Sequence, residues 1–142
     1  MIYIQDSVYQ QLRETLGTHL PECGGVLGAA AGKAISHYSF DSTGISSPVA
    51  YTPDYMRIND ILENWNHEGI EFVGIIHSHD SSCPYPSCGD LVYACRMLLS
   101  NPSLDSMLMP IVTIDPFSIH MYRVSLGDRK PIVHREDWSL LD

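Results

Sequence analysis

Residues 71–90 read EFVGIIHSHDSSCPYPSCGD. The first seven residues form a short and almost wholly apolar run, which is typical of a strand whose two faces are both buried. Two histidines follow, then a loop with two prolines, and a helical pattern begins near Ser87. A buried strand that leads into a helix is typical of α/β folds, and such sheets open into a crevice at the carboxyl ends of their strands.

Amphipathic periodicity predicts a helix on each side of this strand. Apolar residues recur every three or four positions over residues 54–69 and over residues 87–100. A third helix is predicted over residues 6–16, with Asp6 or Ser7 as its N-cap.

The rest of the chain is predicted as short strands and one loop. Residues 41–48 are assigned to the loop. The strands are expected at residues 24–30 and 33–40, joined by a turn at Ala31-Gly32, at 107–115 and 118–125, joined at Asp115-Pro116, and at 131–136. The expected fold class is α/β, a single domain over residues 1–142 whose mixed sheet has helices packed on its faces.

Charge and composition exclude several classes of partner. Only 8 Lys and Arg stand against 17 Asp and Glu, for a net charge of -9, which argues against nucleic-acid binding. No run approaches the roughly 18 apolar residues that cross a membrane. The N-terminus MIYIQDSVYQ lacks a signal-peptide pattern, so we expect a cytoplasmic protein with free thiols. The sequence contains no CxxC pair, so a structural zinc site made of four cysteines is not expected.

The two histidines have the spacing of metal ligands. In an extended strand, His77 and His79 point to one side and Ser78 points to the other. Two imidazoles supply half of a tetrahedral zinc site. Asp90, in the first turn of the next helix, is close enough in sequence to fold back as a third ligand. Two histidines and one carboxylate leave the fourth position to water, as in hydrolytic zinc sites.

The spacing from Ser87 to Asp90 has a second interpretation. A serine followed three residues later by an acid is close to a capping box, in which each side chain bonds to the other residue's backbone N–H. Helix geometry would then fix both side chains. The two interpretations are compatible, because capping residues can still face the crevice.

The motif from His77 to Asp90, His-Ser-His, seven residues, Ser, two residues, Asp, resembles that of the JAMM metalloproteases, also called MPN+ or JAB, with its spacing unbroken. The stretch PECGGVLGA from Pro21 resembles the family's glutamate-bearing segment, and the likeness extends to about Val124. The length is similar to that of stand-alone prokaryotic JAB proteins. The resemblance implies the MPN/JAB sheet architecture, which is like that of cytidine deaminases.

Site roles follow from the resemblance position by position. It implies His77, His79 and Asp90 as ligands of one Zn²⁺ ion per chain. It implies Glu22 as the general base that takes a proton from the zinc-bound water. Ser87 would donate a hydrogen bond to the oxyanion of the tetrahedral intermediate.

Other glutamates compete for the role of base. Glu68 and Glu71 lie at the far end of the strand, about 20 Å from His77 at the usual rise per residue. Glu63 lies on the preceding helix. Only Glu22 therefore has a counterpart in the family motif.

The activity implied is zinc-dependent hydrolysis of a peptide or isopeptide bond in a protein or peptide substrate. The expected substrate is a ubiquitin-like protein whose extended C-terminal tail adds as a strand beside the cleft. Gly24-Gly25 would let a substrate backbone approach closely. Asp80 stands where the family commonly has proline, which leaves the substrate preference open.

Two rival functions remain. Non-catalytic MPN scaffolds bind partner proteins but typically lack motif residues, and all five are present here. A zinc hydrolase of small amides would use the same metal site. A nucleotide deaminase would also bring a PCxxC ligand pair, which the sequence lacks.

Overall fold

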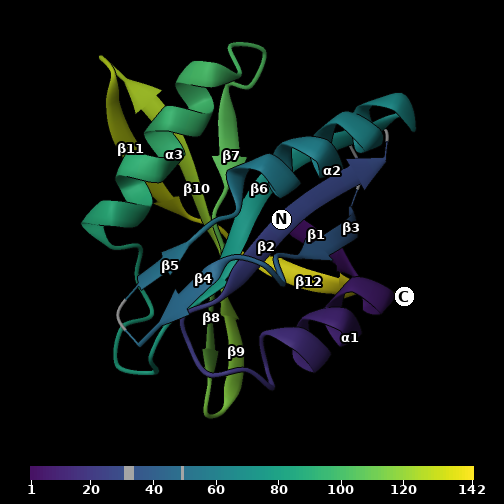
Figure 1. Cartoon of the computed structure of the whole chain (residues 1–142), viewed down its shortest axis with the longest axis vertical. Helices are drawn as coiled ribbons and strands as arrows, with labels where there is room; N and C mark the ends of the chain where they lie inside the picture. Colours follow the sequence, from purple (N-terminus) through teal and green to yellow (C-terminus); the bar gives the residue numbers. More distant parts are fainter. Residues whose placement is uncertain (31–33, 49) are drawn as a thin grey trace.

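The computed structural model describes residues 1–30, 34–48 and 50–142 (Figure 1), so the predicted turn at Ala31-Gly32 lies outside the described residues. The described helices are α1 (Asp6–Thr15), α2 (Tyr55–His67) and α3 (Cys88–Ser100). The described strands are β1 (Ile2–Gln5), β2 (Gly24–Ala30), β3 (Ile35–Phe40), β4 (Ile45–Ser47), β5 (Ala50–Thr52), β6 (Ile70–Ser78), β7 (Ser106–Leu108), β8 (Ile111–Ile114), β9 (Phe117–His120), β10 (Tyr122–Gly127), β11 (Lys130–Arg135) and β12 (Trp138–Leu141).

The main sheet is mixed and runs in the order β11-β10-β7-β6-β2-β3-β1-β12, with the β8–β9 hairpin attached to β6. Strand β6 pairs antiparallel with β2 and parallel with β7 and β8. The predicted buried strand is therefore central, and the expected α/β class with a mixed sheet is confirmed.

Helices cover both faces of this sheet, so apolar side chains of β6 enter two cores. Ile76 packs in the core that contains Val8 and Leu12 of α1. Its neighbour Ile75 packs in the other core, with residues of α2 and α3. Figure 1 shows α1 lying apart from α2 and α3. Because side chains alternate along a strand, His77 lies on the same face of β6 as Ile75, towards α2 and α3.

Several predicted boundaries are wrong at the N-terminal side. Strand β1 runs directly into α1, so the N-cap is Gln5, without a side-chain cap bond, instead of Asp6 or Ser7. Strand β1 was not expected; it pairs in parallel with β12, which was not expected either. The predicted loop 41–48 contains β4, which forms a separate two-stranded sheet with β5.

Each of the two long strands predicted near the C-terminus divides in two. The first divides at Met109-Pro110, because proline lacks the N–H needed to continue a ladder. Strand β7 pairs with β6 at Gly74, whereas β8 pairs with it beside His77. The second divides at Met121, where the chain leaves β8 as partner and joins β7 and β11. Strand β8 thereby lies beside the end of β6 that carries the histidines.

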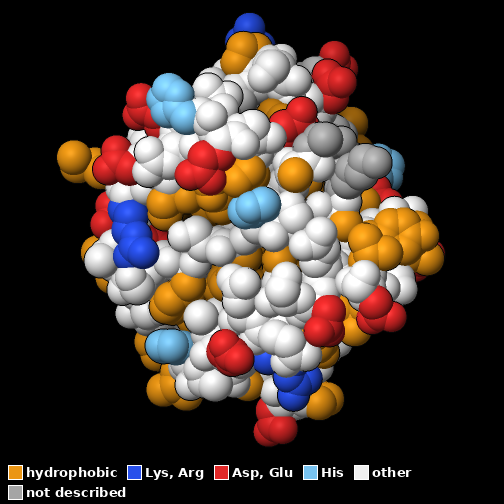
Figure 2. All heavy atoms as spheres, turned by 90° about the vertical axis from the view of Figure 1, so that its right-hand side faces the viewer, with side chains coloured by type: hydrophobic (Ala, Val, Ile, Leu, Met, Phe, Trp, Pro, Cys, Tyr) orange, Lys and Arg blue, Asp and Glu red, His pale blue; other side chains and the backbone are white. Residues whose placement is uncertain are grey.

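None of the described helices has the length and apolar character needed to cross a membrane. On the face shown in Figure 2, acidic and basic side chains are interspersed and the basic ones form no continuous patch.

Candidate metal centre

The two histidines at the end of β6 lie on one side of the strand, as their spacing predicts. His77 and His79 are 4% and 3% exposed, and their Nε2 atoms are 2.9 Å apart. Ser78 between them points to the opposite face, where its Oγ accepts a hydrogen bond from the N–H of Cys23. Both imidazoles thus face α3.

The hydrogen bond at Nδ1 of His79 indicates which ring nitrogen carries a proton. Its Nδ1 lies 2.8 Å from the backbone oxygen of Cys83, which can only accept a hydrogen bond. When the ring is neutral, as a metal ligand must be, Nδ1 therefore carries the proton and the lone pair is on Nε2. Metal-binding histidines are usually oriented by such a bond from the second ring nitrogen.

Asp90 meets both histidines from the first turn of α3. Its Oδ1 lies 2.9 Å from Nε2 of His77, and its Oδ2 lies 3.1 Å from Nε2 of His79. Oδ2 also accepts a 2.7 Å bond from the N–H of Ser87, whose Oγ accepts from the N–H of Asp90. The carboxylate of Asp90 therefore completes the capping box of α3 and contacts both histidines at the same time.

Electrostatics favour the ionised form of this carboxylate. Burial acts to raise the pKa of Asp90, but the hydrogen bonds with His77 and His79 outweigh it and hold the pKa well below its ordinary value. For His79, burial acts to lower the pKa, and the bond with Asp90 reverses the direction, so that the pKa is raised.

Glu22 reaches the site from the segment just before β2, the strand that pairs with β6. In the antiparallel register of β2 and β6, Gly24 lies opposite His77, which places residue 22 opposite His79 where the register continues. Its Oε1 lies 3.9 Å from Nε2 of His79. Burial raises the pKa of Glu22, and His79 and His77 oppose this only in part. The competitor Glu71 pairs with Ala29 at the far end of β6.

The donor atoms suit a cation. Glu22, His77 and His79 each offer a ligand atom, and these atoms lie within 4.8 Å of one another. Asp90 is nearer still to both imidazoles. Neighbouring ligands of a tetrahedral zinc are roughly 3.3 Å apart, given bonds of about 2.0–2.1 Å. The spacings among His77, His79 and Asp90 are close to that value, whereas Glu22 lies farther out.

Comparisons with known proteins identify the family and the fold of the chain. A family model described as prokaryotic homologs of the JAB domain matches residues 4–138. The chain belongs to this family. No curated protein matches the sequence. The solution structure of protein DSY2949 from Desulfitobacterium hafniense is similar in fold to this JAB domain, with a TM-score of 0.72 and 19% identity over 100% of this chain and 94% of that one.

Ser87 lies at the N-cap of α3 and is exposed. Its Oγ accepts the capping bond, and a hydroxyl has one further proton to donate. The geometry of the cap therefore leaves Ser87 able to act as a donor in the JAB domain.

The expected role of Gly24-Gly25 is wrong. A Cβ on Gly24 would meet the ring of Tyr51 at 2.7 Å, and a Cβ on Gly25 would meet the carbonyl oxygen of Ser39 at 2.3 Å. The chain's own atoms fill the space beside both glycines. Close packing within the JAB domain, and not the approach of a substrate backbone, accounts for them.

Sequence reasoning missed the hairpin β4–β5, which lies against this site. The N–H of Glu22 donates a 2.9 Å bond to the carbonyl oxygen of Ser47, and the hydroxyl of Ser46 donates to the carbonyl oxygen of Glu22. Tyr51, from the same hairpin, stacks on His77. Strands of three residues are too short for a periodic signal, so only the aromatic side chain of Tyr51 marked this segment in the sequence.

Ser78→Ala is expected to lower the free energy of unfolding by about 1–3 kcal/mol, because the buried N–H of Cys23 loses its side-chain acceptor. The measurement is urea denaturation of the metal-free protein. The matched control is Ser139→Ala, at an exposed serine of β12. Equal stability losses in the two variants would show that the bond between Cys23 and Ser78 contributes nothing.

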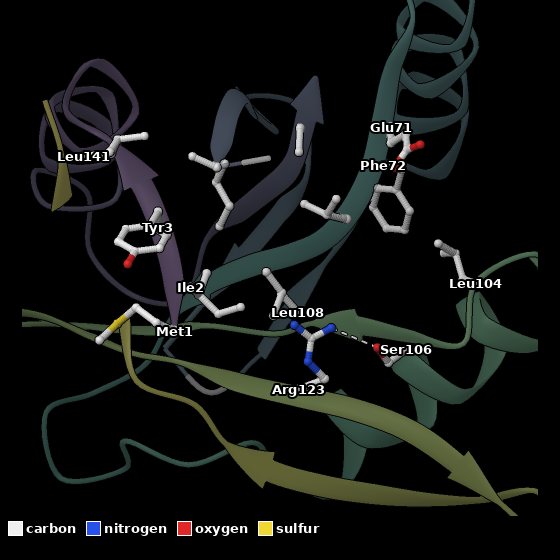
Figure 3. Close-up of a pocket in the computed structure, with 14 residues that line it drawn as sticks. Met1, Ile2, Tyr3, Glu71, Phe72, Leu104, Ser106, Leu108, Arg123 and Leu141 are labelled. Atoms are coloured by element: carbon white, nitrogen blue, oxygen red, sulfur yellow. Dashed lines mark hydrogen bonds between the residues drawn. The ribbon is translucent and has the colours of Figure 1, made fainter. Parts of the chain in front are cut away.

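Hollows in the surface lie both near and far from the site. One of about 250 Å³ adjoins the metal centre and is lined in part by Pro21, His79 and Asp80. Another of about 540 Å³ is lined by Tyr3, Phe72 and other residues around the opposite end of β6 (Figure 3). Of the five motif residues, His79 lines the smaller of these two hollows, and none lines the larger one.

Proposed function

We propose that this JAB domain is a zinc-dependent peptidase or isopeptidase. The observation that carries the proposal is the convergence of His77, His79 and Asp90, whose side-chain donor atoms lie 2.9–3.1 Å apart at the end of a buried strand. A ligand set of two imidazoles and one carboxylate is that of catalytic zinc sites, which keep one position open.

A zinc ion bound at this site would supply a Lewis acid that makes water nucleophilic near neutral pH. Nε2 of His77, Nε2 of His79 and the carboxylate of Asp90 would hold it. The bond from His79 to the backbone oxygen of Cys83 keeps that ring in the required orientation.

Glu22 and Ser87 perform the proton transfer and the stabilisation of charge. Glu22 lies beside the histidines but outside the closest set of donor atoms, so its carboxylate takes the proton of the attacking water and passes it to the leaving amine. Its raised pKa suits a group that must hold a proton in transit. The hydroxyl of Ser87 donates to the oxyanion as it forms.

The proposed substrate is a protein with an extended C-terminal tail, of the ubiquitin-like kind. The hollow beside His79 gives room for residues next to the scissile bond. Hairpin β4–β5 stands outside the main sheet, and its Ile45 is 69% exposed, so an extended tail has a strand edge to pair with.

The proposed location is the cytoplasm. The four cysteines are free thiols, which suits a reducing compartment.

The test uses the full chain loaded with zinc and a panel of substrates. One set consists of ubiquitin-like proteins ending in Gly-Gly, fused to a reporter. A matched set carries bulky residues in place of Gly-Gly, and a third consists of simple amides. We expect cleavage after the Gly-Gly tail, loss of cleavage in the matched set, and no cleavage after chelation.

The rival functions give different outcomes with the same panel. Hydrolysis of simple amides without cleavage of any fusion would support the small-molecule hydrolase. A protein that binds zinc stoichiometrically and cleaves neither class would support the scaffold. Either result would overturn the proposed activity.

A further inference from the structure

The two histidines of the metal centre are held in different ways. Nδ1 of His79 is fixed by the backbone oxygen of Cys83. For Nδ1 of His77, no hydrogen-bond partner is found among residues 1–30, 34–48 and 50–142. Metal-binding imidazoles nearly always need such support to keep their orientation. The described residues therefore give the ring of His77 no hydrogen bond of the kind that holds His79.

The ring of Tyr51 lies against this imidazole. The two ring centroids are 6.4 Å apart and the ring planes differ by 28°. A Cβ on Gly24 would come within 2.7 Å of the Tyr51 ring and 2.9 Å of Cβ of His77, so the phenol occupies the space that glycine leaves beside the ligand. An offset stacked ring of this kind limits rotation of its partner.

A buried carboxylate holds the phenol in place. Oδ2 of Asp41, which is 4% exposed, accepts a 2.6 Å bond from the Tyr51 hydroxyl and a 2.9 Å bond from the N–H of Asp54. Gly44 makes room on this side too, since a Cβ there would meet both partners.

The same hairpin reaches the candidate base. Tyr51 pairs with Ser46 across β4–β5, and Ser46 donates to the carbonyl oxygen of Glu22. The segment that supports the imidazole of His77 therefore also supports the backbone of Glu22.

We propose that Tyr51 is a positioning residue of the metal centre: its ring, packed beside Gly24 and Gly44, orients His77 by stacking where His79 is oriented by a hydrogen bond. The inference rests on the proposed zinc site. It assigns the orienting effect to the aromatic ring and not to the hydroxyl, so a variant that keeps the ring keeps the metal.

The experiment measures zinc affinity of the full chain by competition with a chromophoric chelator, and the visible spectrum of the Co²⁺-loaded protein. Tyr51→Leu and Tyr51→Met are expected to weaken zinc binding about 10- to 100-fold and to alter the Co²⁺ spectrum, as the loss of an orienting partner does. Tyr51→Phe is expected to stay within about threefold of the parent, because stacking needs only the ring. Tyr3→Leu, at a tyrosine of β1 that is 46% exposed, is the matched control.

The outcomes separate this inference from the proposed function. Absence of zinc binding in the parent would contradict the proposed function itself. Parent-like zinc affinity in a folded Tyr51→Leu or Tyr51→Met would overturn the positioning role alone. So would a loss of tenfold or more in Tyr51→Phe, because the hydroxyl and not the ring would then be responsible. Circular dichroism of the metal-free proteins identifies the variants that fold.

Discussion

Glu22→Gln is expected to lower the rate of hydrolysis about 10²- to 10⁴-fold while zinc remains bound, because an amide cannot accept the proton of the attacking water. The change is nearly isosteric, so the backbone bonds of Glu22 to hairpin β4–β5 are retained. The measurement combines single-turnover cleavage of the Gly-Gly fusion with metal analysis of the purified variant.

Glu63→Gln is the matched control for that variant. Glu63 is exposed on α2 and was a competitor for the role of base on sequence grounds. Its removal is expected to leave both rate and zinc content unchanged. Full activity in Glu22→Gln would remove Glu22 from the mechanism and direct attention to another proton acceptor.

Asp90→Asn is expected to reduce the zinc content from about one ion per chain to nearly none. The carboxylate contacts both imidazoles, so its neutralisation removes one ligand and the negative charge that compensates the cation. Outer partners of metal ligands typically contribute 10- to 100-fold in affinity, and a ligand should contribute more. Titration with zinc against a chelator measures the loss.

Thermal unfolding supplies a second measurement of the same effect. A ligand at 100 times its dissociation constant stabilises the native state by about 2.7 kcal/mol, so chelation should lower the melting temperature of the parent and leave Asp90→Asn unaffected. Asp80→Asn, at an exposed carboxylate of the adjoining loop, is the matched control and should behave as the parent does. A parent-like zinc content in Asp90→Asn would show that Asp90 only caps α3.

Together the two variants decide which carboxylate is the third ligand. Both Glu22 and Asp90 flank the histidines, with shortest distances to Nε2 of His79 of 3.9 Å and 3.1 Å. Zinc retained in Glu22→Gln and lost in Asp90→Asn supports the roles proposed here. The opposite pattern would exchange them.

Much of the site could be predicted because its residues are close in sequence. His77 and His79 share one side of β6 because side chains alternate in any extended strand. Ser87 and Asp90 are joined by the first turn of α3, whose geometry is the same in every helix. The apolar run before His77 likewise indicated a central strand, and β6 has partners on both sides.

The wrong expectations concern contacts between distant segments. Strand β1 is short and is stabilised by pairing with β12, which is more than 130 positions away. The breaks in the two long strands depend on which neighbours β7 and β10 find in the sheet. The glycines at 24 and 25 signal a close approach, but the sequence does not say what approaches them.

The sequence by itself determined the central strand, the paired histidines and the capped Asp90, because these relations follow from the repeat of one strand and one helical turn. Only the tertiary structure decided that Glu22 lies opposite His79 and that Tyr51 stacks on His77. The first depends on the register of β2 against β6, and the second on a hairpin tied to the buried carboxylate of Asp41. Such placements arise from packing across the whole sheet, and local residue spacing does not encode them.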